Sequence, residues 1–322
     1  MYCLGIESTA HTFGCGIVSF DGKILANERA VYTSVEGMIP DVVRDHHLVH
    51  CDKVIKSAFE KAGLTWKDIG LISFSQGPGL PPSLIVGRDK AVALSKEHNI
   101  PLIGINHCVA HLTIGNLITG FKDPVYLYVS GVNTQVIALS EGKFRVFGET
   151  LDIGLGNALD KFGRIAGLGF PAGPKIESLA KQGKYVEFPY SVKGMDVSFS
   201  GMVNKAQQLL KKEKIEDVCY SFQETSFAML CEIGERALAY TDKKEFLLIG
   251  GVAANKRLNE MLEIMCSARN VKYKPVPMQY TGDQGVMIAW QGILEFKSGR
   301  KDDLNADIRP HERTDDVDVI WI

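Results

Sequence analysis

The feature that most restricts how this chain can fold is a pattern of short apolar runs that occurs twice. The first copy extends from Leu4 to Gly22 and the second from Leu127 to Gly142. In each copy an apolar run leads into a loop of Ser, Thr or Gly, a second apolar run follows, and a glycine-containing turn closes a hairpin. Short hairpins are common, so the repeat favours a duplicated β-rich fold without establishing one.

Around the two copies the chain alternates between helix and strand patterns. Residues 46–61 and 91–98 carry apolar residues at helical spacing, and each stretch precedes a strand-like run, at 69–74 and 102–105. The second half is richer in helix patterns, which cover 157–165, 174–181, 202–212, 221–240, 256–266 and 286–296. This alternation predicts an α/β protein.

The length of 322 residues suits about two domains. We place their boundary near residue 120, which gives domains of residues 1–120 and 121–322. An apolar fraction of 45% and a charged fraction of 23% are typical of a folded globular chain. The net charge of -2 gives no overall attraction to nucleic acid, so any such contact would need a local basic patch.

The sequence also indicates the cellular location of the protein and the redox state of its cysteines. No run approaches the roughly 18 apolar residues of a membrane span, and the first residues lack the pattern of a signal peptide. The seven cysteines form no C-x-x-C pair, which predicts free, buried thiols in a reducing compartment. We therefore expect a soluble cytoplasmic protein that does not contact a membrane.

The segment His107-Cys-Val-Ala-His111 places two histidines at the i, i+4 spacing of a helix that Asn106 can cap. Their Cβ atoms would lie about 5–6 Å apart on one face. That spacing suits two ligands of one metal ion, as in the H-E-x-x-H zinc peptidases. Those enzymes need the glutamate as general base, and it is missing here, so peptidase chemistry is disfavoured. The alternative is two helix histidines held by ordinary hydrogen bonds.

A metal held by two imidazoles would also need an anionic ligand. Asp283 is the best candidate, because it lies in Tyr280-Thr-Gly-Asp-Gln-Gly285 just before an apolar helix pattern. Its alternative role is a helix cap. Tyr128, on the opening strand of the second meander, is a weaker candidate. Two imidazoles, a carboxylate and open positions suit iron or zinc.

Four segments rich in small residues can present backbone N–H groups to an anion. They are Gly5-Ile-Glu-Ser-Thr9, Ser130-Gly-Val-Asn-Thr134, Gly167-Leu-Gly-Phe-Pro-Ala-Gly-Pro174 and Gly250-Gly-Val-Ala-Ala-Asn255. Each alone is more often a plain turn, but four of them beside strand ends favour a nucleotide cleft between duplicated halves. None matches the P-loop. Asp160 and Glu177, near the third segment, are candidate acceptors for ribose hydroxyls, the alternative being a solvated helix face.

The densest basic stretch contains Lys205, Lys211, Lys212 and Lys214. A charge run of this kind is usually a solvated helix face. Its functional alternative is contact with RNA phosphates.

Taken together, these motifs resemble one family along nearly the whole chain: the universal tRNA N6-adenosine threonylcarbamoyltransferases, the catalytic subunit of the KEOPS complex and its bacterial counterpart TsaD. The remaining matching segments are Gly77-Pro-Gly-Leu80 with Ser83 and Gly87, Ala158-Leu-Asp-Lys161, Ser198-Phe-Ser-Gly201 and Ser221-Phe-Gln-Glu224. The ending Arg313-Thr-Asp-Asp-Val-Asp-Val-Ile-Trp321 resembles the archaeal and eukaryotic branch. So many motifs in order are far more specific than any single loop.

The resemblance implies an actin-like, Hsp70-like ATPase fold, which is a duplicated RNase H-like fold with two lobes around a nucleotide cleft. The N-terminal lobe would carry the HxxxH metal motif and the C-terminal lobe the nucleotide-binding loops. The reaction implied is transfer of the threonylcarbamoyl group from threonylcarbamoyl-adenylate to N6 of the adenosine 3′ of the anticodon. This t6A modification occurs in tRNAs that read codons beginning with A, and AMP is released.

The resemblance further implies one metal ion per subunit, usually Fe²⁺ and sometimes Zn²⁺, held by His107, His111 and Asp283, with Tyr128 as an added ligand in this branch. The positions that match the binding site for the adenylate, or for ATP and AMP, are Tyr128, Val129, Ser130, Gly131, Val132, Asp160, Gly173, Glu177 and Asn255. No separate protein nucleophile is expected. The partners implied are tRNA and the other KEOPS subunits, namely a small kinase-like ATPase, a dimerising subunit and a regulatory subunit.

Two residues depart from the family pattern, because Val132 and Ala172 stand where glycine is usual. If either position needed a positive φ, the side chain would be strained and the loop would hold the phosphate differently or more weakly. Other functions stay open on the same fold: an ATPase or small-molecule kinase, a non-catalytic scaffold of a complex, and the disfavoured peptidase.

Overall fold

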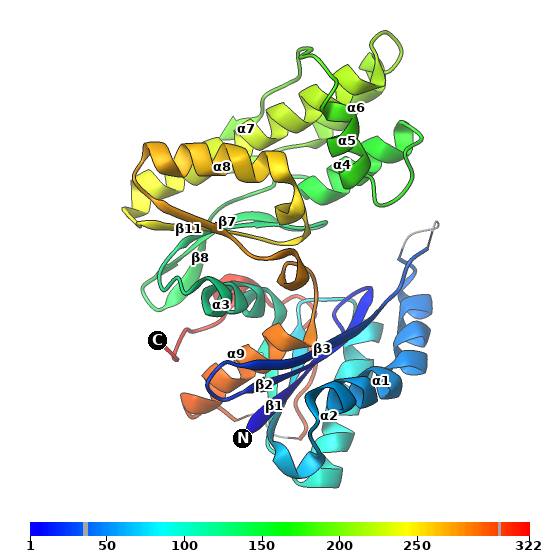
Figure 1. The fold of residues 1–322 in the computed structure, drawn as a ribbon, viewed down its shortest axis with the longest axis vertical. Helices are drawn as coiled ribbons and strands as arrows, with labels where there is room; N and C mark the ends of the chain where they lie inside the picture. The colour runs from blue at the N-terminus through cyan, green and yellow to red at the C-terminus, as the bar shows by residue number, and fades with distance from the viewer. Residues whose placement is uncertain (35–37, 302–303) are drawn as a thin grey trace. The chain divides into compact units, whose positions relative to one another are not determined.

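The structure is a computed structural model that describes residues 1–34, 38–301 and 304–322. The chain forms two compact units (Figure 1). Unit 1 consists of Met1–Ile118, Gly142–Phe144 and Gly282–Ile322, and unit 2 of Thr119–Glu141 and Arg145–Thr281. The first division lies close to the boundary placed at residue 120. The structure differs from that two-domain division at the C-terminus, because residues 282–322 belong to the first unit.

Unit 1 is built on a five-stranded sheet of order β3-β2-β1-β4-β5. The strands are β1 (Tyr2–Glu7), β2 (Thr12–Ser19), β3 (Ile24–Val31), β4 (Ile69–Gly77) and β5 (Leu102–Asn106). The first three form an antiparallel meander, whereas β4 is parallel to β1 and β5 is parallel to β4. The helices are α1 (Pro40–Ala62), α2 (Pro81–His98), α3 (His107–Thr119) and α9 (Gly285–Lys297), with short 3₁₀ turns at Trp66–Asp68 and Thr314–Asp316.

The alternation of side chains along β1 explains why helices cover both faces of this sheet. Leu4 and Ile6 pack with apolar residues of α1 and α2, such as Val54. Cys3, on the opposite face, packs with α3 and α9. Figure 1 shows α1 and α2 on one side of β1–β3 and α9 on the other.

Two glycines allow α9 to lie directly on the sheet. A Cβ at Gly5 would overlap the backbone of Ala289, and one at Gly16 would overlap the backbone of Val286. Because these two glycines have no side chain, the backbone of α9 packs directly against the backbone of β1 and β2. This fit allows residues 282–322 to return to a sheet formed by the N-terminal third of the chain.

Unit 2 is built on a second five-stranded sheet, of order β12-β11-β6-β7-β8. Its strands are β6 (Val125–Val129), β7 (Thr134–Ser140), β8 (Lys143–Glu149), β11 (Glu245–Ile249) and β12 (Lys272–Pro275), and a small hairpin joins β9 (Val192–Lys193) to β10 (Asp196–Val197). The helices are α4 (Leu155–Ile165), α5 (Gly173–Ala180), α6 (Ser200–Leu209), α7 (Ile215–Thr241) and α8 (Lys256–Ala268), with 3₁₀ turns at Gly251–Ala254 and Met278–Tyr280.

The two sheets have the same strand order, in which β1 to β5 correspond to β6, β7, β8, β11 and β12. In both, a meander opens the sheet, the fourth strand lies parallel to the first, and the fifth lies parallel to the fourth. The internal repeat inferred from the sequence is thereby confirmed. The predicted helices are also present, although α7 begins at Ile215 rather than at residue 221, with Glu216 and Asp217 in its first turn.

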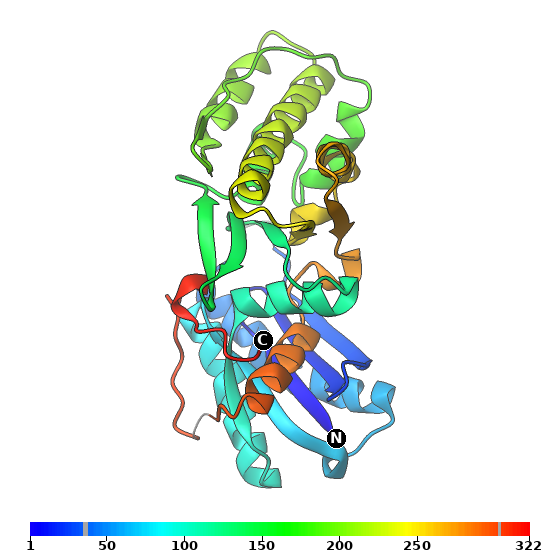
Figure 2. The same cartoon turned by 90° about the vertical axis from the view of Figure 1, so that its left-hand side faces the viewer.

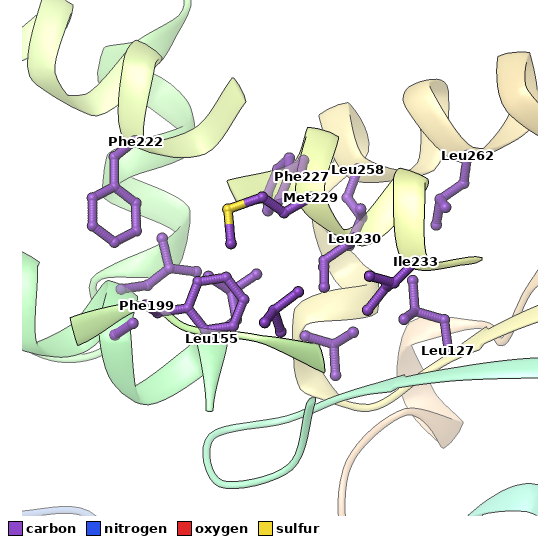
Figure 3. Packing of buried hydrophobic residues seen from close by; sticks show 14 of the residues in the cluster. Leu127, Leu155, Phe199, Phe222, Phe227, Met229, Leu230, Ile233, Leu258 and Leu262 are labelled. Atoms are coloured by element: carbon purple, nitrogen blue, oxygen red, sulfur yellow. The ribbon is translucent and has the colours of Figure 1, made fainter. Parts of the chain in front are cut away.

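The core of unit 2 lies between its sheet and the helices that cover it. Leu230 and Ile233 of α7 point toward Leu127 of β6, beside α8 (Figure 3). Phe162 stacks on Phe222 with ring centroids 5.0 Å apart. The long helix α7, yellow-green in Figure 2, therefore joins the sheet to the smaller helices of this unit.

The cysteines agree with the sequence analysis. All seven are free, and every one except the half-buried Cys231 is buried. Burial raises the pKa of Cys3 and Cys108 to about 12, so both are protonated thiols at neutral pH. Within the described ranges, no helix has the length and apolar character needed to cross a bilayer.

Candidate metal centre and nucleotide-binding loops

The candidate metal centre lies in unit 1, where β5 meets α3. Asn106 ends the strand, and its Oδ1 accepts a hydrogen bond from the Val109 N–H at 3.1 Å, which caps α3 as expected. His107 and His111 follow on one face of the helix, with ring centroids 4.7 Å apart at an interplanar angle of 86°. Both imidazoles are buried, with exposures of 7% and 2%. Such histidines need polar partners inside the protein.

Asp283, in the loop before α9, supplies a carboxylate to both imidazoles. Its Oδ1 lies 3.5 Å from His107 Nε2 and 3.4 Å from His111 Nε2. The three ligand atoms all lie within 4.8 Å of one another. The N-cap position of α9 is occupied by Gln284, whose side chain makes no capping hydrogen bond, so Asp283 does not have the alternative role of N-cap residue. The structure thus brings together the three residues expected to bind a metal, and this donor set fits iron or zinc.

One residue of this site, Glu7, was missed in the sequence. We expected the segment 5–9 to offer N–H groups to an anion, but its carboxylate is fully buried and approaches His107 instead. Glu7 Oε2 lies 2.9 Å from His107 Nδ1, and Oε1 accepts hydrogen bonds from the N–H (2.6 Å) and Oγ1 of Thr9. An acidic residue at the end of an apolar strand was the available signal, because a buried carboxylate needs a partner.

The electrostatics of the cluster favour a cation between its two carboxylates. Burial lowers the pKa of His107, but Glu7 and Asp283 outweigh this effect and raise it to about 9. Burial also lowers the pKa of His111. Burial raises the pKa of Asp283, yet the hydrogen bond with His111 and the charges of both histidines bring it well below its usual range. A metal ion bound to Nε2 of His107 would replace the proton on that nitrogen.

The first nucleotide-binding candidate in unit 2 is the loop after β6. Its carbonyl groups, those of Ser130 and Gly131, accept hydrogen bonds from Gly156 and Asn157 at the start of α4, at 3.1 and 3.0 Å. Within residues 1–34, 38–301 and 304–322, the N–H groups of Gly131 and Val132 donate to no protein acceptor. Exposed N–H groups of this kind suit a phosphate.

The third small-residue segment is joined to α4 by Asp160. Its Oδ1 accepts a hydrogen bond from the Ala172 N–H at 2.8 Å, just before Gly173 begins α5. Burial raises the pKa of Asp160, partly offset by this hydrogen bond. The structure therefore holds Asp160 and Gly173 close to each other.

Glu177 and Asn255 are also brought together. Glu177 Oε1 accepts a hydrogen bond from the Lys256 N–H at 3.0 Å. Asn255 caps α8 by accepting from the Leu258 N–H at 3.1 Å, and its amide donates to Gln223 Oε1 at 3.1 Å. Each of these polar groups thus has a protein partner that fixes its direction.

The loops after β6 and β11 are adjacent because these strands are parallel neighbours. Gly250, at φ +93°, approaches the strand end so closely that a Cβ would overlap the Val129 carbonyl and lie 3.1 Å from Cδ2 of Tyr128. Tyr128 itself is buried in β6, at 2% exposure. Its role as a metal ligand and the contact of the Lys205–Lys214 stretch with RNA stay predictions.

The strain considered for Val132 and Ala172 is absent. Among the described residues, the non-glycine positions with positive φ are Asn99, Glu141, Asp242 and Asn270. Ala172 has φ -88°, and its Cβ occupies the space that a side chain at Gly163 would need. Val132 is 66% exposed. Both replacements are therefore accommodated without a strained backbone.

Comparisons with known proteins agree with this arrangement. A family model for TsaD, tRNA N6-adenosine threonylcarbamoyltransferase, matches residues 22–290. Proteins named tRNA N6-adenosine threonylcarbamoyltransferase from Thermococcus sibiricus and Thermococcus kodakarensis are each 50% identical over 326 residues, which covers 100% of this chain and of each relative. A probable bifunctional tRNA threonylcarbamoyladenosine biosynthesis protein from Methanocaldococcus jannaschii is 51% identical over 326 residues, covering 100% of this chain and 61% of that protein.

Two solved structures have the same fold. HypF from T. kodakarensis aligns with a TM-score of 0.66 and 16% identity, over 92% of this chain and 48% of that chain. The activator of 2-hydroxyisocaproyl-CoA dehydratase from Clostridium difficile, with bound ADPNP, aligns with a TM-score of 0.53 and 14% identity, over 94% and 99%. Together with the duplicated sheet, this likeness confirms the actin-like ATPase fold. From the family match and the full-length identity, the chain belongs to the tRNA N6-adenosine threonylcarbamoyltransferases.

Proposed function

We propose that this chain transfers the threonylcarbamoyl group from threonylcarbamoyl-adenylate to N6 of the adenosine 3′ of the anticodon, in tRNAs that read codons beginning with A. Its family membership supports this reaction. The observation that carries it is the cluster formed by the buried His107 and His111 with the half-buried Asp283. A plain ATPase on this fold would have no need of such a cluster.

The reaction needs orientation and charge stabilisation more than a protein nucleophile. N6 attacks the carbamoyl carbon, which is already activated as a mixed anhydride. The new N–C bond forms while the C–O bond to the phosphate breaks, AMP leaves with the electron pair, and N6 loses a proton. The target base leaves the stack of the anticodon loop, a small cost in a single-stranded loop.

His107, His111 and Asp283 would hold one Fe²⁺ or Zn²⁺ ion, with Tyr128 as a further ligand. When bound, this ion supplies Lewis-acid polarisation of the carbamoyl carbonyl. The chain's own part is to fix the two buried imidazoles beside the half-buried carboxylate, where a charge interacts more strongly than in water.

The adenylate would bind to unit 2. The N–H groups of Gly131 and Val132 would receive its phosphate, because they are exposed and have no protein acceptor within the described part of the chain. Asp160 and Glu177 would accept hydrogen bonds from the ribose hydroxyls. The rest of the binding site would come from the strand end at 128–130, together with Gly173 and Asn255.

We place this activity in the cytoplasm and within a KEOPS complex, with a small kinase-like ATPase, a dimerising subunit and a regulatory subunit as partners. The net charge of -2 favours a role for the partner subunits in binding tRNA, because much of the affinity for tRNA comes from contacts of basic residues with phosphates. Among the residues of this chain, the stretch from Lys205 to Lys214 is the candidate for such contacts.

A transfer assay tests the proposal. The protein, with and without partner subunits, would receive synthetic threonylcarbamoyl-adenylate and unmodified tRNA, alongside His107→Ala and His111→Ala. The control is His98→Ala, since that helix histidine stacks on Trp66. Modified adenosine from the wild type and the control, but not from the two variants, is expected. ATP hydrolysis without any modified tRNA would instead indicate an ATPase, and modification by both variants would indicate that the cluster has no part in the chemistry.

A further inference from the structure

His107 makes a different contact with each of its two ring nitrogens. Nε2 is directed at Asp283 Oδ1, 3.5 Å away, and Nδ1 lies 2.9 Å from Glu7 Oε2. A metal ligand must offer a lone pair, so when Nε2 binds the ion the proton must be on Nδ1. A carboxylate can only accept hydrogen bonds, and Glu7 therefore favours the tautomer that metal binding requires.

Glu7 is itself held by Thr9. Its second oxygen accepts from both the N–H and the hydroxyl of Thr9. The Thr9 hydroxyl also lies 3.3 Å from His107 Nδ1, farther than the carboxylate. Because each Glu7 oxygen has its own partner, the carboxylate has little freedom to rotate away from the imidazole.

The loop before α2 holds Thr9 in turn. The Leu80 N–H donates to the Thr9 carbonyl at 2.8 Å. Gly79 lies against the same residue, since a Cβ there would be 2.6 Å from Thr9 O and 2.9 Å from Thr9 Cβ. Three motifs that are far apart in the sequence, at 5–9, 77–80 and 107–111, thus form one continuous set of contacts that ends at the imidazole.

From these contacts we propose that Glu7 is a positioning residue for the metal centre, which orients His107 and fixes its tautomer, and that Thr9 and the Gly79–Leu80 loop hold Glu7 in place. The inference rests on the proposed metal site. Loss of such an outer partner typically weakens metal affinity 10–100-fold, because the ligand must then be oriented at the moment of binding.

The test is the Zn²⁺ affinity of the full chain, measured by competition with a chromogenic chelator. Glu7→Gln should bind Zn²⁺ about 10–100-fold more weakly than the wild type. Thr9→Val keeps the shape and the N–H but removes the hydroxyl, and Gly79→Ala displaces Thr9, so each should weaken binding by a smaller factor of roughly 3–10. In the Co²⁺-loaded protein, the visible absorption bands should shift for Glu7→Gln.

The matched control is Glu295→Gln. Glu295 is also fully buried in unit 1, paired with Arg300 and Gln291, but it lies about 15 Å along α9 from Gly285. Its Zn²⁺ affinity should stay within twofold of the wild type, even though the protein loses stability. This comparison separates a general effect of removing a buried charge from an effect on the metal.

The outcomes are distinct. Wild-type affinity in folded Glu7→Gln would overturn the inference while leaving the metal site in place. If Glu7→Gln does not fold, wild-type affinity in both Thr9→Val and Gly79→Ala would overturn it. Absence of Zn²⁺ binding by the wild type itself would overturn the proposed metal centre. Weaker binding by the Glu7 and Thr9 variants, with an unchanged control, supports the inference.

Discussion

The loops after the first strands of the two sheets occupy the same place in the repeat but differ in chemistry. At the end of β1, the chain buries the Glu7 carboxylate and directs it at His107. After β6, it exposes Gly131 and Val132 and uses carbonyl groups to start α4. Shared topology therefore sets where a loop lies, whereas the residues of the loop set which groups it presents, a buried carboxylate in one unit and exposed N–H groups in the other.

The histidines show the same contrast between the units. All eight lie in unit 1, and unit 2 has none. Among the described residues, the His-His-Asp cluster suited to a metal is also in unit 1. All imidazole side chains thus belong to one unit, while the candidate nucleotide loops of the other rely on backbone groups and carboxylates.

The proposed division, with metal binding in unit 1 and nucleotide binding in unit 2, would be wrong if the metal cluster also governed nucleotide binding. His107→Ala should reduce transfer to tRNA by about 100-fold or more, since the charge that develops on the carbonyl loses its stabilisation. Its affinity for AMP should stay within about twofold of the wild type if unit 2 binds the nucleotide. Modified adenosine in digested tRNA and calorimetric titration with AMP measure the two effects. A tenfold loss of AMP affinity would contradict the separation.

Gly79 in unit 1 and Gly250 in unit 2 each lie against the backbone of a neighbouring segment, and Gly250 also has a positive φ. Gly250→Ala should destabilise the protein by about 3 kcal/mol, because it combines a positive φ with an overlap at the Val129 carbonyl. Gly194→Ala is the control, since that glycine also has positive φ but has no atom within 4 Å of a new Cβ. It should cost about 1 kcal/mol. Urea unfolding followed by circular dichroism measures the free energy of unfolding of both variants. Equal losses of stability would mean that the overlap with the Val129 carbonyl does not contribute.

Acid should destabilise unit 1 through His47. Burial, with the nearby His46, lowers the pKa of His47 from 6.5 to about 4. The unfolded chain then binds the proton more strongly, so stability is complete above pH 6.5 and falls as the pH drops toward 4. From pH 7 to pH 5 the loss should be about 2 kcal/mol.

Tryptophan fluorescence during urea unfolding measures this loss, because all three tryptophans, Trp66, Trp290 and Trp321, lie in unit 1. His47→Gln removes the titrating group and should flatten the dependence between pH 7 and pH 5. An equally steep dependence in that variant would assign the effect to other groups.

Local sequence patterns predicted much of this molecule. Short apolar runs and hairpin turns revealed the repeated meander, and helical spacing placed His107 and His111 on one face. Distant contacts were harder to foresee. The return of α9 to the first sheet depends on Gly5 and Gly16 lying in adjacent strands, and local periodicity does not report such a fit. Glu7 was hidden for the same reason, because its partner lies 100 residues away.

The smallest expected effect concerns Val132, the residue that departs from the family pattern. Since its φ is not positive and its side chain is 66% exposed, Val132→Gly should relieve no strain. The added freedom of glycine in the unfolded chain should lower stability by about 0.5–1 kcal/mol. Affinity for AMP should change less than about threefold, since the N–H group is present with either residue. If glycine instead tightened AMP binding tenfold, the valine side chain would be blocking the phosphate, and the two loops would differ in access as well as in charge.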